Sequence, residues 1–308
     1  MNESTNPLST KQQVLLGIGG ILLITVILAG IFGSEGRNDE FQPADEFELI
    51  PWVPLTVGPL DMSLNKGVLY VVLASTLTCG VMVYIANRMQ ARPNRVQTAV
   101  ELAYTFTTDQ IIGANLHDRK MARKWFPFIA TLFFFILFSN LIGYIPLPTN
   151  SAEPFHIGGL AIPSFAIYAA TANLSVPLVL TLMVVVGYHV EGIRAKGFFA
   201  YVRGWVPSGI TGVAAVPIFF IEVISQLVRI ISLSVRLFAN ILAGHLLILF
   251  MAGGLVVILG IAAIGAITLP VAIVFFMFEV VLIAGLQAFI FATLTAIYLG
   301  EATSVEGH

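Results

Sequence analysis

Long runs of apolar residues constrain this chain more than any other feature. About 20 consecutive apolar residues are enough for one helix to cross a bilayer. Runs of roughly this length occupy residues 14–32, 68–86, 125–147 and 174–189, and two longer ones occupy residues 213–257 and 261–299. A single upright crossing needs no more than about 25 residues, so we expect the two long helices to be tilted, kinked or partly interfacial.

The composition excludes a soluble globular protein. Hydrophobic residues make up 57% of the 308 residues and charged residues only 10%, whereas soluble domains are about one quarter charged. The single cysteine, Cys79, lies inside an apolar run and cannot form an intramolecular disulfide. We therefore predict an all-α integral membrane protein, a polytopic helical bundle in which two long, tilted C-terminal helices form an antiparallel hairpin.

The charged residues predict the orientation of the spans. Basic residues gather between the second and third runs: Arg88, Arg92, Arg95, Arg119, Lys120, Arg123 and Lys124. Arg194, Lys196 and Arg203 follow the fourth run, whereas the segment between the first two runs is rich in acidic residues. Because lysine and arginine concentrate in cytoplasmic loops, we expect these basic loops and the C-terminal "EATSVEGH" on the cytoplasmic side.

Two segments have more than one interpretation. Residues 14–32 are either a retained helix or a signal peptide, since the residues before them are hardly basic and "VILAGIFG" only loosely resembles a cleavage site. Residues 1–66 would then form a hydrophobic segment plus an acidic external one, and residues 67–308 the membrane domain. Residues 93–115 predict an amphipathic helix on the cytoplasmic surface, either a connector or a site for lipid or a partner.

Ionisable residues inside the last two apolar runs need an explanation. The stretch "SLSVRLFANILAGHLLILF" places Arg236 near the middle of a span, where an arginine costs about 3 kcal/mol on insertion scales. Glu222, Arg229, His245 and Glu279 also lie in these runs. Ionisable groups within a membrane normally face a bundle interior or a water-filled cavity and mark an ion path.

Helical geometry sorts these residues onto different surfaces. At about 100° per residue, one stripe of the helix contains Glu222, Arg229, Ser232, Arg236 and Asn240. His245 follows Arg236 by nine residues, which places it on roughly the opposite face and about 13 Å further along the axis.

Antiparallel pairing of the two long helices would bring polar residues to equal depths. The pairs Arg236–Gln287 and His245–Glu279 are both centred near residue 262, in a glycine-rich segment that favours a turn. An arginine–glutamine level is therefore expected on the cytoplasmic side of a histidine–glutamate level.

The same register extends to the cytoplasmic ends of the two helices. It places Glu222 opposite Glu301. We expect Arg229 to interact near the membrane interface rather than to take part in transport.

The residue types suggest separate tasks for the two levels. A histidine and a carboxylic acid in an apolar setting can take up and release protons near neutral pH, as His245 and Glu279 would. Arg236 stays protonated, so it attracts a carboxylate and repels protons, while Gln287 could hydrogen-bond it without neutralising it. The acid on its own stripe, Glu222, is about 21 Å away along the helix, which favours a carboxylate of another polypeptide.

Structural roles remain open at several of these positions. His245 and Glu279 could form a buried pair with no part in transport. Small polar residues such as Ser232, Asn240 and Asn140 either hold membrane helices together or serve the ion path.

Paired C-terminal motifs resemble the a subunit of F-type ATP synthases. They are "SLSVRLFANILAGHLL" and "LIAGLQAFIFATLTAIYL", and "FILFSNLIGYIPLP" and "TANLSVPLVLTL" fit the same family. The resemblance covers roughly residues 68–300. It implies a stator beside a rotating ring of c subunits, with two offset aqueous half-channels, and makes residues 67–308 the ion-translocating domain. It also implies peripheral-stalk b subunits as partners, together with the lipid bilayer and the transported proton.

The resemblance also implies roles for individual residues. Arg236 would separate the half-channels and engage each ring carboxylate. Asn240, Gln287 and Ser232 would be polar positions along the proton path. His245 and Glu279 would line the outer half-channel, and Glu222 the inner exit. Some relatives have an acid where Gly143 stands in this chain.

Other functions make different predictions. A secondary transporter would show internal repeats, a self-contained channel would need an acid at the depth of Arg236, and a structural anchor would need none of these residues. No phosphate-binding GxxxxGK[ST] loop occurs, so we expect a non-catalytic subunit, and we predict neither cofactor nor metal. The N-terminus lacks an Arg- and Ser-rich presequence, which favours a bacterial plasma membrane, and proton or sodium coupling is left open.

Overall fold

The computed structural model describes residues 23, 45–58, 60–88, 92–116, 118–157, 160–207, 210, 212–254 and 264–304. The chain divides into two compact units, each described here by itself. The larger comprises Leu49–Leu242 and Val280–His308, and the smaller comprises Met1–Glu48 and Ala243–Glu279. The predicted first span, apart from residue 23, and the predicted turn near residue 262 lie outside the described residues, and the division at residue 66 remains a prediction.

Five helices among the described residues are long and apolar enough to cross a membrane. They are Lys66–Arg88, Arg119–Gly143, Ser175–Lys196, Gly212–Gly254 and Ile267–Thr303. Each coincides with one of the apolar runs predicted from the sequence. The prediction of an all-α, polytopic membrane protein with long C-terminal helices is therefore confirmed.

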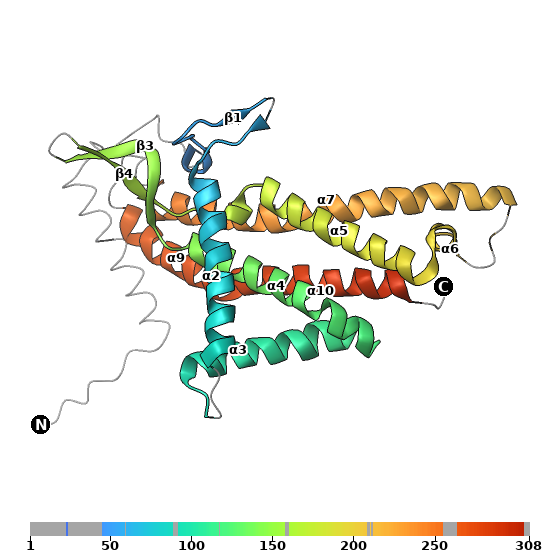
Figure 1. Ribbon diagram of the computed structural model, residues 1–308. Coiled ribbons are helices and arrows are strands. Elements are labelled where there is room, and N and C mark those ends of the chain that lie inside the picture. The colour runs from blue at the N-terminus through green and yellow to red at the C-terminus, as the bar shows by residue number, and fades with distance from the viewer. Residues whose placement is uncertain are drawn as a thin grey trace, which may run out of the picture. The chain divides into compact units, whose positions relative to one another are not determined.

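Helix α10 (Ala284–Thr303) packs against α4 (Arg119–Gly143) and α5 (Ser175–Lys196) in the larger unit, and α4 also contacts α2 (Lys66–Arg88). Figure 1 shows α2 crossing the direction of α10 at a steep angle. The buried side of α10 carries alanine at every fourth position: Ala284, Ala288, Ala292 and Ala296, all fully buried. Small side chains at this spacing form one face on which membrane helices can approach closely.

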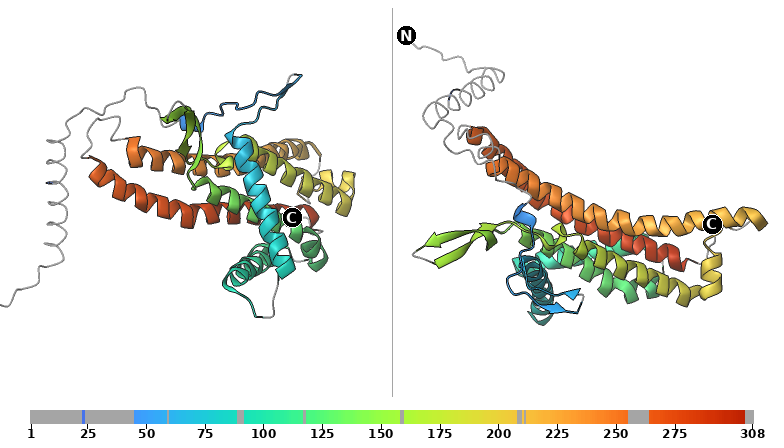
Figure 2. Two further views of the ribbon diagram at one scale, coloured as in Figure 1. Left: turned by 60° about the vertical axis from the view of Figure 1, so that its left-hand side comes forward. Right: turned by 90° about the horizontal axis from the view of Figure 1, so that it is seen from above.

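The two longest apolar stretches are not uniform α-helices. Helix α7 (Ala215–Leu249) continues into the π-helical turn η5 (Phe250–Gly254), and α9 (Gly265–Phe278) continues through the π-helical turn η7 (Glu279–Ile283) into α10. Up to Leu242, α7 lies alongside α10 with the opposite chain direction, so these two segments of the larger unit are antiparallel (Figure 2). Wider π-turns are common at functional positions, and Glu279 begins one of them.

A further helix confirms the secondary structure expected for residues 93–115. Asn94 caps α3 (Arg95–Phe106) by accepting a hydrogen bond from the Gln97 backbone N–H at 2.8 Å, and the helix continues as the π-helix η2 (Thr107–Gly113). Among the apolar and aromatic residues of this segment, Ile111 is buried, whereas Val96 and Tyr104 are more than half exposed. The helix therefore keeps an apolar surface that the described residues leave exposed.

The connections between spans contain elements that the sequence did not predict. The hairpin of β3 (Leu147–Ile157) and β4 (Leu160–Ala166) is antiparallel and pairs Leu147 with Ala166. Shorter elements are β1 (Thr56–Val57), β2 (Leu60–Asp61), η1 (Asp45–Phe47), η3 (Ala170–Ala172), α6 (Phe198–Arg203) and η4 (Gly212–Ala214). The strands lie outside the candidate spans, where backbone groups do not have to be satisfied within one helix.

The C-terminal end of α4 lies directly against the segment that follows β4. A Cβ atom on Gly143 would overlap with Ala169, so glycine is required at the end of α4. Space for a larger side chain at this position, such as an acid, is lacking in this chain.

Candidate functional site

Arg236 lies on the exposed side of α7. Its Nη2 donates a hydrogen bond to Ser232 Oγ at 3.3 Å, one turn earlier in the same helix. Apolar residues on neighbouring turns, Ile231 and Val235, are also exposed. No carboxylate among the described residues forms an ion pair with Arg236. An always-charged guanidinium thus faces outward from an apolar helix.

The other polar residues of the predicted arginine level are arranged differently. Gln287 is buried in α10, with 4% of its surface exposed, whereas Asn240 is exposed on α7. In the part of the chain that the structure describes, no hydrogen bond joins Arg236 to Gln287. The sequence analysis suggested that Gln287 could hydrogen-bond Arg236. Arg236 bonds to Ser232 instead, which lies four residues earlier and is therefore its neighbour on the same helix.

His245 and Glu279 are both buried within the smaller unit. A Cβ atom on Gly244 would overlap with the Glu279 carboxylate, so this carboxylate lies directly against the backbone beside His245. The ring of Phe47 packs edge-on against the His245 ring with centroids 6.4 Å apart. Sequence reasoning missed Gly244, although a glycine next to an intramembrane histidine signals a close approach.

Glu222 belongs to a chain of hydrogen bonds in the larger unit. Gln226 Nε2 donates to Glu222 Oε1 at 2.7 Å, and the Tyr188 hydroxyl donates to Gln226 Oε1 at 2.6 Å. Tyr188 belongs to α5, so these hydrogen bonds connect α5 to α7. The sequence singled out Glu222 but gave no reason to connect it with Tyr188, since the two are far apart in the chain.

Arg229 is neutralised within the chain. Its Nη1 donates to Glu301 Oε2 at 3.0 Å, and its guanidinium lies 4.8 Å from the centre of the Tyr298 ring. The expectation that Glu222 lies opposite Glu301 was therefore wrong, because Glu301 pairs with Arg229 instead. The Arg229–Glu301 pair centres on residue 265 rather than 262.

Asn140 holds three elements of the bundle together. Its Nδ2 donates to the Ala284 carbonyl at 3.3 Å, and its Oδ1 accepts from Thr171 Oγ1 at 2.6 Å. The residue is completely buried. The sequence left two roles open for Asn140, helix packing and a place on the ion path. Its contacts favour helix packing, because the side-chain amide joins α4, α10 and η3.

The sequence did not predict the ion pair between α4 and α5. Lys124 Nζ lies 2.6 Å from Glu191 Oε1, and the Glu191 side chain is only 7% exposed. A buried carboxylate needs such a partner, because removal from water is costly for an unpaired charge. This pair fixes the helices that flank α10.

Tyrosines gather near the start of α2, also in the larger unit. The Tyr70 and Tyr168 rings lie 5.4 Å apart, and Lys66 Nζ lies 5.4 Å from the centre of the Tyr168 ring. Burial raises the pKa of Tyr168 to about 12, so this phenol stays protonated at physiological pH. Lys66 is itself buried, which its position in an acidic loop did not predict.

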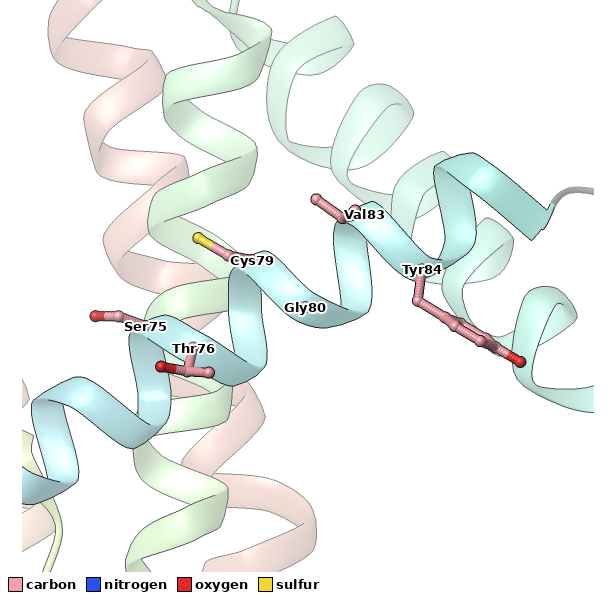
Figure 3. A pocket seen from close by; sticks show the side chains of 6 residues that line it. All are labelled: Ser75, Thr76, Cys79, Gly80, Val83 and Tyr84. Carbon is pink, nitrogen blue, oxygen red and sulfur yellow. The ribbon is translucent and has the colours of Figure 1, made fainter.

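The larger unit also has two surface hollows. One of about 630 Å³ on α2 is lined by Ser75, Thr76, Cys79, Gly80, Val83 and Tyr84. Figure 3 shows these residues on successive turns of α2, with the ring of Tyr84 directed away from Cys79 and Val83. Another of about 660 Å³ contains Asn115, Asp118 and Glu301. None of the sequence-predicted transport residues lines either hollow, and the described residues contain no cluster of three or more potential metal ligands.

Comparison with known proteins identifies the family. The family model described as ATP synthase A chain matches residues 68–300. The chain belongs to the ATP synthase subunit a family. This match contains the two C-terminal motifs on which the sequence-based resemblance depended, and it includes Arg236, Glu222, His245, Glu279 and Gln287.

Curated members of the family are similar over nearly their whole length. ATP synthase subunit a of Hyphomonas neptunium is 35% identical over 277 residues, which cover 86% of this chain and 97% of the relative. The subunit of Rhizobium rhizogenes is 32% identical and covers 86% and 98% respectively. That of Brucella ovis is 33% identical, with 84% and 96% covered.

Membership of the ATP synthase subunit a family determines the coarse function. The chain is a non-catalytic, multi-pass subunit of the membrane sector, with a proton-translocating role in ATP synthesis. The recognition made from the motifs is therefore confirmed.

Proposed function

We propose that this subunit is a stator that forms two offset proton half-channels against a ring of c subunits. Proton flow through the half-channels would drive ring rotation and ATP synthesis. The membrane bilayer is the bacterial plasma membrane, peripheral-stalk b subunits hold the stator in place, and the C-terminus is cytoplasmic. The family match and the positions of the ionisable residues support this proposal.

The observation that carries the proposal is the outward-facing Arg236. A charged group on an apolar, membrane-spanning surface is unfavourable unless an opposite charge reaches it. Ser232 supplies only a neutral hydrogen-bond acceptor at 3.3 Å. A carboxylate on a ring subunit supplies the missing negative charge, and each carboxylate would engage Arg236 in turn as the ring rotates.

The outer half-channel is assigned to His245 and Glu279. Close packing of the Glu279 carboxylate on Gly244 places an acid beside a histidine in a buried setting. These two groups would pass a proton to a ring carboxylate released from Arg236. Once neutral, that carboxyl group can face lipid, because the cost of burying its charge has been removed.

The inner half-channel is assigned to Glu222. A proton leaving the ring would pass Glu222 on its way to the cytoplasm, with Ser232, Asn240 and Gln287 as polar positions near Arg236. Moving one charge through the membrane potential supplies about 2.3 kcal/mol per 100 mV, so several protons are needed for each ATP.

Replacement of Arg236 by alanine tests the proposal. We expect assembled complexes with Arg236→Ala to lose ATP-driven acidification of inverted membrane vesicles. Passive proton leak and subunit composition are measured in the same vesicles. Normal acidification by an assembled Arg236→Ala complex would refute the proposal.

Arg229→Ala is the matched control, because it removes an arginine two helical turns away. Arg229 is already paired with Glu301 inside the chain. We expect this variant to keep ATP-driven acidification, with at most reduced stability. If both variants lost ATP-driven acidification equally, coupling would depend on positive charge anywhere on α7 and not on the position of Arg236.

A further inference from the structure

The hydrogen-bonded chain from Tyr188 to Glu222 has a direction. We propose that Tyr188 is a positioning residue that acts through Gln226 to reserve Oε1 of Glu222 as a hydrogen-bond acceptor, so that protons bind and leave at Oε2. This inference depends on the proposed role of Glu222 in the inner half-channel. It assigns a function to two residues, on α5 and α7, that sequence motifs did not single out.

Tyr188 is held rigidly enough to orient its neighbour. Its side chain is buried, with 3% of the residue exposed. The His189 ring lies 4.5 Å from the Tyr188 ring between centroids, and the Tyr298 ring lies 5.9 Å away. These neighbouring rings hold the Tyr188 ring, and with it the hydroxyl oxygen, in one position.

The Tyr188 hydroxyl anchors the Gln226 amide in the orientation that an ionised Glu222 requires. An amide has one oxygen acceptor and one NH₂ donor, on opposite sides. With Oε1 accepting from Tyr188 at 2.6 Å, the NH₂ group is directed at Glu222, where Nε2 donates to Oε1 at 2.7 Å. The reversed amide would bring two acceptor oxygens together whenever Glu222 is ionised.

The two oxygens of Glu222 are consequently not equivalent. Oε1 accepts from Gln226 whether the carboxyl group is charged or neutral. No described residue donates a hydrogen bond to Oε2, and Glu222 is only partly buried. In each cycle one proton binds Oε2 and the same proton leaves to water, which regenerates the carboxylate without altering the hydrogen bond at Oε1.

Removal of the Tyr188 hydroxyl tests this mechanism. In Tyr188→Phe the Gln226 amide loses the hydrogen bond that anchors its oxygen, and we expect passive proton conductance of membrane sectors stripped of the catalytic head to fall about 2- to 10-fold, the factor that corresponds to one net hydrogen bond. Gln226→Leu should lower conductance by at least as much. Tyr298→Phe is the matched control: it removes a neighbouring hydroxyl that makes no hydrogen bond within the described structure, and it should leave conductance unchanged.

A spectroscopic measurement separates positioning from general packing. The infrared carboxyl band of Glu222 in the whole complex is assigned as the pH-difference band lost in Glu222→Gln. We expect this band to shift in Tyr188→Phe and to stay in place in Tyr298→Phe. A normal conductance together with an unshifted band in Tyr188→Phe would overturn the inference.

A double-mutant comparison distinguishes failure of this inference from failure of the proposed function. If Tyr188 acts through Glu222, adding Tyr188→Phe to Glu222→Ala should cause no further loss of conductance. Additive losses would overturn the positioning role. Normal conductance in the Glu222→Ala variant would refute the proposed inner path. If Glu222→Ala loses conductance while Tyr188→Phe conducts as well as the wild type, only the inference about Tyr188 is refuted.

Discussion

Arg229 and Arg236 lie on the same face of α7 but have opposite electrostatic environments. Arg229 forms a 3.0 Å ion pair with Glu301 and lies over the Tyr298 ring, so its charge is neutralised by α10. Arg236 follows by seven residues, and within the described part of the chain its one hydrogen bond is to Ser232 at 3.3 Å. The two residues are of the same type and lie on the same helix. They differ because Arg229 has a carboxylate partner, Glu301, among the described residues and Arg236 has none there.

This difference separates a structural charge from one available to a partner. A paired arginine fixes the distance between two helices and has no reason to exchange its partner. An arginine without an internal carboxylate can engage and release an external one repeatedly, which is the requirement for coupling to a moving ring. The following variants test this contrast, beginning with the largest expected effect.

Arg236→Lys should abolish coupling although the positive charge is retained. Lysine has a single ammonium group instead of a planar fork that binds carboxylates at two points, and it loses its proton more easily when buried. We expect ATP-driven acidification of inverted vesicles to fall about 100-fold or more. Arg229→Lys, measured in parallel, should remain active, and similar losses in the two variants would break the comparison.

Gly244→Ala should impair proton transfer in a site that depends on packing within the chain. The new methyl group would overlap with the Glu279 carboxylate and displace it from the position beside His245. Because overpacking costs about 1–3 kcal/mol, we expect passive proton conductance to fall about tenfold or more. Gly253→Ala is the control, since a Cβ atom there meets nothing within 4 Å. Full conductance in Gly244→Ala would exclude a role for this close contact.

Ser232→Ala removes the internal hydrogen bond of Arg236 and should have a moderate effect. The bond is long and exposed, so its loss is expected to lower the rate of ATP-driven acidification by about threefold. Ser234→Ala is a useful control, because the Ser234 hydroxyl bonds only to backbone carbonyls of its own helix. A complete loss of acidification in Ser232→Ala would mean that Ser232, rather than a partner, satisfies Arg236.

Glu301→Gln should have the smallest effect. Both side chains of the Arg229–Glu301 pair are partly exposed, at 27% and 49%, so solvent screening limits the pair to at most about 1 kcal/mol of stability. We expect a slightly lower midpoint of thermal unfolding for the assembled complex and unchanged acidification. Uncoupling by Glu301→Gln would show that the paired arginine also takes part in transport.

Much of this fold could be predicted from apolar runs alone, because every backbone group in a bilayer must be satisfied within a helix. The sequence thus determined the candidate spans, the α-helical class and the presence of ionisable residues inside them. It also determined the family, through motifs around Arg236 and Gln287. The β3–β4 hairpin was not predicted, because its strands lie outside the bilayer, where this rule does not apply.

Only the tertiary structure decided which charges are paired. Helical phase placed Arg229 and Arg236 on one stripe, but the choice of Arg229 by Glu301 depends on how α7 and α10 pack side by side. The contact of Glu279 with Gly244 and the chain from Tyr188 to Glu222 likewise join residues distant in sequence. Sequence fixes which chemical groups are available, whereas hydrogen bonds and ion pairs act over a few ångströms and are therefore decided by packing.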